Sequence, residues 1–412
     1  MKKYIFLAMA IGGINGAEQY IFNKMNYLKD NDYKVFIFSG RKSEILIHAF
    51  DPFERLIRPA LRFYPSSLRK KEREDYINWL LGELDIQSDD TFIIESSSTI
   101  CSLWGDLIAE RLHCRHFAYI LHESFALSDE IRRFFRFKVS RHELAGIVDD
   151  SVQKMLGDPA LEPRPDTRIR AFCNNVVQEC DDVFSAQLNS DVDYNIGSIG
   201  RLEKNYVMPL IESLCLYFNN NPNKRFNLVL VGGCADIRQE KNIRKAVEKC
   251  KNVHLVLTGA MYPIPKSFVQ KIDLFISAAG SASASFYAQR PTVKVDWNFG
   301  TPLGLLGYDL FPTGNLQSES KYRLEQYIDM VLADHVHIDY VDNYEESYSK
   351  RINDEFDRHL KIAMEPTELE YYNANTIKYT DVKYRICSVV SHLFGVKTAY
   401  GIVEAIRKTV RE

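Results

Sequence analysis

Short apolar runs alternate with amphipathic stretches along most of this 412-residue chain, and the alternation limits the folds open to it. Each apolar run has about the length of a buried strand, and each stretch between runs has the spacing of a helix with one apolar face. Strands that are separated by helices run parallel, because each helix returns the chain to the edge where the next strand starts. The pattern therefore predicts an α/β fold with doubly wound parallel sheets.

The predicted elements fall into two similar series. The first has strands at 4–11, 33–39, 91–95, 117–121 and 145–148, with helices at 17–30, 68–84 and 101–112. The second has strands at 195–199, 227–231, 253–257, 274–277 and 292–295, with helices at 207–220, 238–250 and 264–271. Because a chain of this length exceeds what one hydrophobic core serves, each series predicts a domain.

The domain boundaries follow from composition. We expect an N-terminal domain over residues 1–178 and a second domain over 195–335. Residues 179–194 are rich in Asp, Asn and Ser, which is typical of a linker. Residues 336–412 have helical patterns, and we expect them to pack back toward the N-terminal domain.

Composition excludes several classes of protein. Apolar residues at 46% and charged residues at 26% are those of an ordinary soluble protein. A formal net charge of −3 argues against a globally basic nucleic-acid binder. The eight Cys form no CxxC pair, which fits a reducing cytoplasm. Residues 4–11 look like a first buried strand rather than a signal peptide, and no apolar run reaches the length that crosses a bilayer.

Two strand-to-helix turns in the second half carry the main functional signal. Ile199–Lys204 reads Ile-Gly-Arg-Leu-Glu-Lys, and Ala279–Ser283 reads Ala-Gly-Ser-Ala-Ser. Backbone N–H groups at a helix start and the cations of Arg201 and Lys204 can hold a diphosphate from two sides. The alternative is a solvated loop in which Glu203 pairs with a neighbour.

The second turn supplies small residues and hydroxyls at a helix start. Gly280, Ser281 and Ser283 are the phosphate-binding candidates there, and plain N-capping by one of the serines is the alternative. A sugar nucleotide is the ligand that the two turns suggest together.

A glycine-rich turn also follows the first predicted strand. Gly12, Gly13 and Gly16 allow the backbone to approach a ligand closely. Their spacing is not Gly-x-Gly-x-x-Gly, so a dinucleotide site is not predicted.

His122 is the candidate for contact with the reacting sugar. It follows the predicted strand 117–121, at the sheet edge where open α/β folds bind ligands. The adjacent Glu123 is a weaker candidate, as an acid or as a contact to sugar hydroxyls. An ordinary polar loop residue is the alternative. His113 and His116 have no metal-ligand spacing with supporting acids, so we predict no metal site.

Two basic stretches of the first half are interleaved with aromatic residues. The first comprises Arg55, Arg58, Arg62, Arg69, Lys70, Lys71 and Arg73, and the second comprises Arg132, Arg133, Arg136, Lys138 and Arg141. Such mixtures suit an anionic membrane surface that carries a lipid-linked acceptor, and we place Arg132, Arg133 and Arg136 there. Solvated helix faces are the alternative. No nucleic-acid-binding module accompanies them, so we predict no nucleic-acid partner.

The ordered series of turns resembles the family-4-type retaining glycosyltransferases. The matching segments are Gly12–Glu18, Cys173–Val177, Gly200–Lys204, Val229–Gly233, Asn252–Gly259 and Asp273–Ser277. The resemblance implies a GT-B fold, in which two Rossmann-like doubly wound domains face each other across a cleft. It also implies donor contacts by Gly13, Gly16, Gly232 and Thr258, and catalytic roles for His122, Arg201 and Lys204.

The resemblance further implies a nucleotide-sugar donor as substrate, with no cofactor and no metal. One feature of the family is missing. The family carries two glutamates eight positions apart after the last matched strand, where this chain has no acid between Ser277 and Pro291. Anchoring on Pro291 puts Ala284 at the second glutamate position, so the contacts to the donor sugar and ribose must differ.

The favoured interpretation is a cytoplasmic hexosyltransferase, peripheral on the inner membrane face. It would transfer a sugar with retention to a surface polysaccharide, such as lipopolysaccharide or capsule, or to a glycolipid. A non-catalytic nucleotide-sugar-binding protein or partner subunit is the main alternative, because it accommodates the missing glutamates. A sugar-nucleotide 2-epimerase is less favoured, since it needs carboxylates near the donor sugar.

Overall fold

The computed structural model describes residues 1–41, 46–121, 127–147, 149–158, 160, 167–169, 176–234, 236–311, 320–341, 344–378 and 382–411. The chain forms two compact units. The first unit comprises Met1–Cys173 and Tyr348–Arg407, and the second comprises Asn174–Ser347 and Lys408–Glu412. Residues 179–194, which have the composition of a linker, belong to the second unit, where Phe184 and Leu188 pack against its core.

The first unit contains a five-stranded parallel sheet in the order β2-β1-β3-β4-β5. Its strands are β1 (Lys2–Ala8), β2 (Tyr33–Ser39), β3 (Thr91–Ser96), β4 (Arg115–Ile120) and β5 (Leu144–Gly146). β1 is buried over all but its first residue, so its apolar run is that of a central strand. The chain passes from β1 to β2 on one side of β1 and then crosses to β3 on its other side. The switch point of this sheet therefore lies between β1 and β3.

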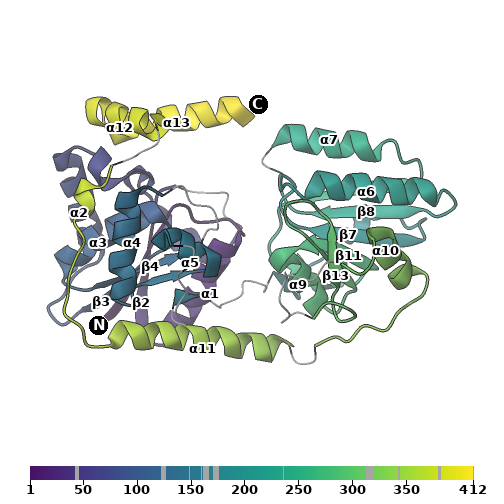
Figure 1. The fold of residues 1–412 in the computed structure, drawn as a ribbon, viewed down its shortest axis with the longest axis horizontal. Coiled ribbons are helices and arrows are strands. Elements are labelled where there is room, and N and C mark those ends of the chain that lie inside the picture. Colours follow the sequence, from purple (N-terminus) through teal and green to yellow (C-terminus); the bar gives the residue numbers. More distant parts are fainter. Residues whose placement is uncertain are drawn as a thin grey trace. The chain divides into compact units, whose positions relative to one another are not determined.

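Helices surround this sheet. They are α1 (Gly16–Asp30), α2 (Lys70–Glu83), α3 (Thr99–Leu112), α4 (Asp129–Ser140), α5 (Asp149–Leu156), α11 (Tyr344–Met364), α12 (Val382–Phe394) and α13 (Val396–Arg411). In Figure 1, α12 and α13 (yellow) follow one another along one side of the unit, and α11 (yellow-green) lies along another. Residues 348–407 therefore belong to the first unit.

A buried polar cluster fastens α11 to this unit. The Lys24 ammonium contacts the Glu95 carboxylate, and both side chains are at most 1% exposed. Lys24 Nζ also lies 3.0 Å from His359 Nδ1, and His359 Nε2 lies 3.2 Å from Glu355 Oε1. Because each charge is paired inside the protein, removal of one partner leaves an uncompensated buried charge.

The second unit contains a six-stranded sheet in the order β13-β12-β11-β7-β8-β9. Its strands are β7 (Tyr194–Ile199), β8 (Phe226–Val231), β9 (Val253–Gly259), β11 (Leu274–Ala278), β12 (Thr292–Val295) and β13 (Pro302–Leu305). β13 is antiparallel to β12. The prediction of a purely parallel sheet is therefore wrong at this edge. The Asp296 side chain accepts hydrogen bonds from the N–H groups of Asn298 and Phe299, both at 2.8 Å, and this turn reverses the chain into β13.

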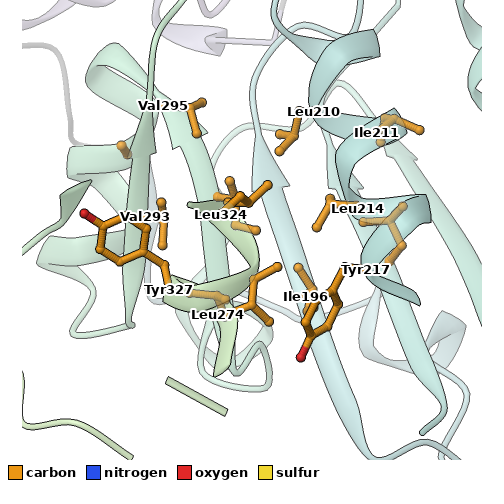
Figure 2. Packing of buried hydrophobic residues seen from close by; sticks show 14 of the residues in the cluster. Ile196, Leu210, Ile211, Leu214, Tyr217, Leu274, Val293, Val295, Leu324 and Tyr327 are labelled. Atoms are coloured by element: carbon orange, nitrogen blue, oxygen red, sulfur yellow. The ribbon is translucent and has the colours of Figure 1, made fainter. Parts of the chain in front are cut away.

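One hydrophobic cluster of the second unit lies between a sheet face and its helices, and another, which includes Val229 and Phe275, lies on the opposite face. Figure 2 shows Ile196 and Leu274 from the strands packed with Leu210 and Leu214 of α6 (Val207–Asn220). Tyr327 of α10 (Leu324–Leu332) closes the same cluster. The remaining elements are α7 (Ile237–Val247), α8 (Lys266–Val269), α9 (Ala279–Tyr287) and the two-residue strands β6 (Val177–Gln178) and β10 (Ile264–Pro265).

Some predicted boundaries are wrong. The first strand ends at Ala8 rather than at residue 11, because the next residues enter the glycine turn. The predicted helix 264–271 is the short strand β10 followed by the four-residue helix α8, since Ile264 and Pro265 pair with β6. Within the described ranges, no helix is long and apolar enough to cross a membrane.

Candidate functional site

The switch point of the second sheet lies between β7 and β11. The chain passes from β7 to β8 and β9 on one side and occupies β11 and β12 on the other. Their backbones pair at Leu274 with Ile196 and at Phe275 with Gly197. Further along, the Ile199 N–H donates to the Ser277 hydroxyl at 2.9 Å, so a side chain takes the place of a ladder carbonyl. The direct ladder thus ends before the carboxyl ends of the strands, where open α/β sheets bind ligands.

Two glycines allow the backbones to meet at this edge. Gly232 has φ +157°, and a Cβ there would lie 1.9 Å from the Gly200 carbonyl oxygen. Gly200 has φ +152°, and a Cβ there would lie 2.5 Å from Tyr206 Oη and 3.9 Å from Ser281 Oγ. The turn after β7, the end of β8 and the first turn of α9 therefore adjoin. The structure thus brings Gly232 and Ser281, two predicted donor contacts, next to Gly200 of the Ile199–Lys204 turn.

The N-terminus of α9 has no side-chain cap. Its N-cap residue is Ala278, which has no acceptor, and neither Ser281 nor Ser283 takes that role. Ala279 has φ 50°, a conformation that alanine rarely adopts, and both Ala279 and Gly280 are exposed. By contrast, side chains cap α1, α3, α4 and α7, through Asn15, Ser98, Ser128 and Asp236. The first N–H groups of α9 are thus available to an external acceptor.

Arg201 and Lys204 lie in the turn between β7 and α6. Arg201 Nη1 is 3.4 Å from Glu203 Oε1, and the arginine side chain is 57% exposed. This pair is the arrangement that the solvated-loop alternative describes. Exposed ion pairs contribute little, so a phosphate can replace Glu203 at small cost. The Lys204 side chain is exposed.

Among the remaining predicted donor contacts, Thr258 has a hydrogen-bond partner within the protein. The Thr258 hydroxyl, near the end of β9, donates to the Gly259 carbonyl at 2.9 Å. Ser283 is half-buried on α9. The buried Ser285 hydroxyl donates to the Ala282 carbonyl at 3.2 Å and accepts from Thr292 Oγ1 at 2.9 Å, so it fastens α9 to β12. The hydroxyls of Thr258 and Ser285 therefore have structural hydrogen bonds.

Two residues near this edge were missed by the sequence analysis. Tyr206 is buried, its phenol faces Gly200, and burial raises its pKa to about 12, so it remains neutral. Lys294 is half-buried on β12 opposite Ser277, and burial lowers its pKa. We find no partner for its ammonium among the described residues. A lone lysine between Val293 and Val295 was the signal that could have revealed it.

The glycine turn of the first unit differs from the turns of the second. Asn15 Oδ1 accepts from the N–H groups of Ala17 and Glu18, at 3.0 and 3.3 Å, and so occupies the start of α1. A Cβ added at Gly13 would lie 3.2 Å from the Glu18 carboxylate, whereas a Cβ added at Gly16 would have no atom within 4 Å. A carboxylate beside the turn favours hydroxyl groups over phosphate as its ligand. His122, Glu123 and residues 173–175 lie outside the described residues.

Arg132 and Arg136 of α4 make intramolecular contacts. Arg132 Nη1 pairs with Asp129 Oδ1 at 3.0 Å, and Arg136 Nε donates to the Leu156 carbonyl at 3.0 Å. Phe134 and Phe135 on the same helix are buried. These contacts match the solvated-face alternative, and Arg133 is exposed.

The first unit also contains a buried Ser–His–Asp arrangement. Ser96 Oγ lies 2.9 Å from His116 Nε2, and His116 Nδ1 lies 2.7 Å from Asp106 Oδ1. All three residues are at most 1% exposed, and Lys138 Nζ takes the same carboxylate oxygen at 2.7 Å. A substrate cannot reach this serine, so the cluster joins α3 and α4 to the sheet. Among the described residues, no group of His, Cys, Asp or Glu could hold a metal ion.

Comparison with known proteins places this geometry in a fold family. No protein-family model and no curated protein matches the chain. A glycosyltransferase from Rickettsia africae ESF-5 aligns with a TM-score of 0.55 at 12% identity, over 88% of this chain and 98% of that one. Anabaena Alr3699/HepE in complex with UDP and glucose aligns with a TM-score of 0.52 at 12% identity, over 98% and 99%.

A third structure agrees with these two. The lipopolysaccharide outer core galactosyltransferase WaaB, in its apo form, aligns with a TM-score of 0.50 at 13% identity, over 87% of this chain and 98% of that one. The chain has the GT-B fold. At these identities the likeness shows the fold alone, with its two Rossmann-like domains. Ala284, which the anchoring on Pro291 puts at the second glutamate position of the resembling family, is buried, and so is Ile276 eight residues earlier.

Proposed function

We propose that this protein is a glycosyltransferase of the hexosyltransferase type that moves a sugar from a nucleotide-sugar donor to a glycan or lipid-linked acceptor. One observation carries the proposal: the Gly200–Arg201 turn and the uncapped start of α9 adjoin at the switch point of the second sheet. This site offers backbone N–H groups, a helix dipole and a cation to one ligand.

The chemistry of the site suits a diphosphate leaving group. The N–H groups of Gly280 and Ser281 would bind phosphate oxygens, with the Ser281 hydroxyl as a further donor. Arg201 would exchange Glu203 for the phosphate, and Lys204 would add a second cation. Charge develops on the diphosphate as the glycosidic bond breaks, and fixed donors and cations lower the energy of that state. The proposal requires no metal and no cofactor.

The donor and acceptor classes come from the fold neighbours. HepE, whose structure is in complex with UDP and glucose, makes UDP-sugars the first donors to test. WaaB acts in the lipopolysaccharide outer core, which supports a surface glycan as the acceptor. Retention of the anomeric configuration rests on the family resemblance, and so does the role of His122 near the reacting sugar.

The test is a product assay with a panel of nucleotide sugars. We expect one donor to give free nucleoside diphosphate and a glycosylated acceptor, both measured by chromatography and mass spectrometry. An isomerised donor sugar with no transfer would indicate an epimerase instead. His122→Ala should lower turnover more than donor affinity, and an equal loss of affinity and thermal stability would point to a structural role.

A non-catalytic nucleotide-sugar binder is the second candidate. It is favoured by the absence of any acid between residues 277 and 291. Binding of a nucleotide sugar without release of nucleoside diphosphate, over a wide range of acceptors, would select this alternative.

A further inference from the structure

An apolar stripe of α12 points away from the protein. Ile386, Val389 and Leu393 are 60%, 57% and 62% exposed, and Phe394 is 66% exposed. Positions i, i+3 and i+7 lie along one side of a helix. A helix of a globular protein normally directs such a stripe into the core, so its exposure marks an interaction surface.

The two C-terminal helices are nevertheless fixed to the first unit. Arg69 donates from Nε and Nη2 to the carbonyls of His392 and Leu393, both at 2.5 Å. The His392 ring lies 3.0 Å from the Ser67 carbonyl, and the Val396 N–H donates to Glu72 Oε1 at 3.2 Å. The C-terminal end of α12 and its His392 ring therefore contact the protein, while the apolar stripe remains exposed.

Positive charge accompanies this stripe. Residues 382–411 contain six Lys or Arg and one Glu, although the whole chain has a net charge of −3. Arg385 and Lys397 are exposed in the described part of these helices. Exposed apolar residues on a basic helix are typical of segments that lie in the interface of an anionic bilayer.

A cavity beside the stripe adds a polar recess. It has a volume of ≈ 600 Å³, and Val389 and Leu393 of the stripe line it together with Lys378, Arg385, His392 and Ser66. Cations and hydroxyls at the edge of an apolar surface match the phosphate of a lipid headgroup.

We propose that α12 and the start of α13 dock this protein on an anionic lipid bilayer. The side chains of Ile386, Val389, Leu393 and Phe394 enter the headgroup region, while Arg385 and Lys397 face lipid phosphates. The protein lies on the bilayer, since none of its described helices is able to span one. The proposal goes beyond sugar transfer and would stand if the protein only bound nucleotide sugars.

The test is co-sedimentation of the full chain with vesicles. We expect binding to phosphatidylglycerol vesicles at low salt and much weaker binding to phosphatidylcholine vesicles, because the surface is cationic. A Leu393→Ser/Phe394→Ser variant should bind at least about a hundredfold more weakly, since two large apolar side chains leave the interface. Leu216→Ser on α6 is the matched control, because Leu216 is 67% exposed in the other unit, and it should bind as the wild type does.

A second variant reports insertion directly. Phe394→Trp should show blue-shifted fluorescence on addition of phosphatidylglycerol vesicles, and matching circular dichroism melts would establish that each variant folds. A wild-type protein that ignores these vesicles at low salt would overturn the proposal. So would a wild-type dimer that becomes monomeric in the Leu393→Ser/Phe394→Ser variant with unchanged vesicle binding, because the stripe would then join two copies of the chain.

Discussion

At the scale of single residues, Gly232 lies where the second unit has no room for a side chain. A Cβ at this position would lie 1.9 Å from a backbone oxygen, which cannot rotate away as a side chain can. We therefore expect Gly232→Ala to destabilise the fold by more than about 2 kcal/mol, measured as a lower unfolding temperature. Gly16→Ala is the control, because nothing lies within 4 Å of its Cβ position at the start of α1. Equal stability of the two variants would contradict the backbone contact.

Arg201 is the residue on which the proposed diphosphate site depends most. Arg201→Ala should weaken donor binding and transfer by at least about tenfold, because a charge-assisted contact to phosphate is lost. Arg244→Ala is the matched control, since Arg244 is an exposed arginine of α7 that pairs with Glu240 at 2.8 Å. Binding isotherms of the folded variants decide this, and unchanged affinity in Arg201→Ala would remove the residue from the site.

The sequence predicted the backbone of this site better than its side chains. Turns after buried strands have strong local signatures, and Gly200, Gly232 and Ser281 meet as the order of strands requires. The partners of hydroxyl and charged groups are decided by tertiary neighbours. Thr258 therefore bonds to its own strand end, and the burial of Lys294 was not predicted.

At the scale of elements, α11 is held by groups whose charge depends on pH. Burial, together with the nearby Lys24 ammonium, lowers the pKa of His359 to about 3, and these effects outweigh the adjacent Glu355 carboxylate. The folded state thus keeps His359 neutral, while the unfolded chain protonates it below about pH 6.5. Its contribution to stability is complete above that pH and is lost as the pH falls toward 3.

We expect stability to fall between pH 6.5 and 4.5 partly because of this residue. His359→Gln should reduce the slope of unfolding free energy against pH by up to about 1.4 kcal/mol per pH unit. Denaturant melts across this range measure the slope. His337→Gln is the control, since that ring is 89% exposed. An unchanged slope in His359→Gln would show that His359 is not buried in its neutral form.

Elements with strong periodicity were predicted well, and those formed by distant contacts were not. The strand at residues 33–39 and the helix at 207–220 have the predicted bounds, because each carries a complete local pattern. β13 was missed, since its pairing with β12 depends on the turn that Asp296 holds. α8 is short because β10 takes the residues before it into a pairing with β6.

At the scale of the whole molecule, the candidate diphosphate site and the proposed bilayer surface belong to different units. Residues 200–204 and 279–283 lie in the second unit, whereas α12 lies in the first. The Leu393→Ser/Phe394→Ser variant should therefore bind the nucleotide-sugar donor as tightly as the wild type. Calorimetry with the donor would check this, and a loss of donor affinity comparable to that of Arg201→Ala would contradict the separation.

The most direct measurement of the central claim is saturation-transfer NMR of the wild-type chain with a panel of nucleotide sugars, beginning with UDP-sugars. We expect saturation of at least one donor, displacement by the matching nucleoside diphosphate, and much weaker displacement by the monophosphate, because the proposed site at Gly200 and α9 would bind both phosphates. The signal should fall in Arg201→Ala and persist in Arg244→Ala. A folded wild-type protein that transfers saturation to no nucleotide sugar in the panel would contradict the proposed donor site.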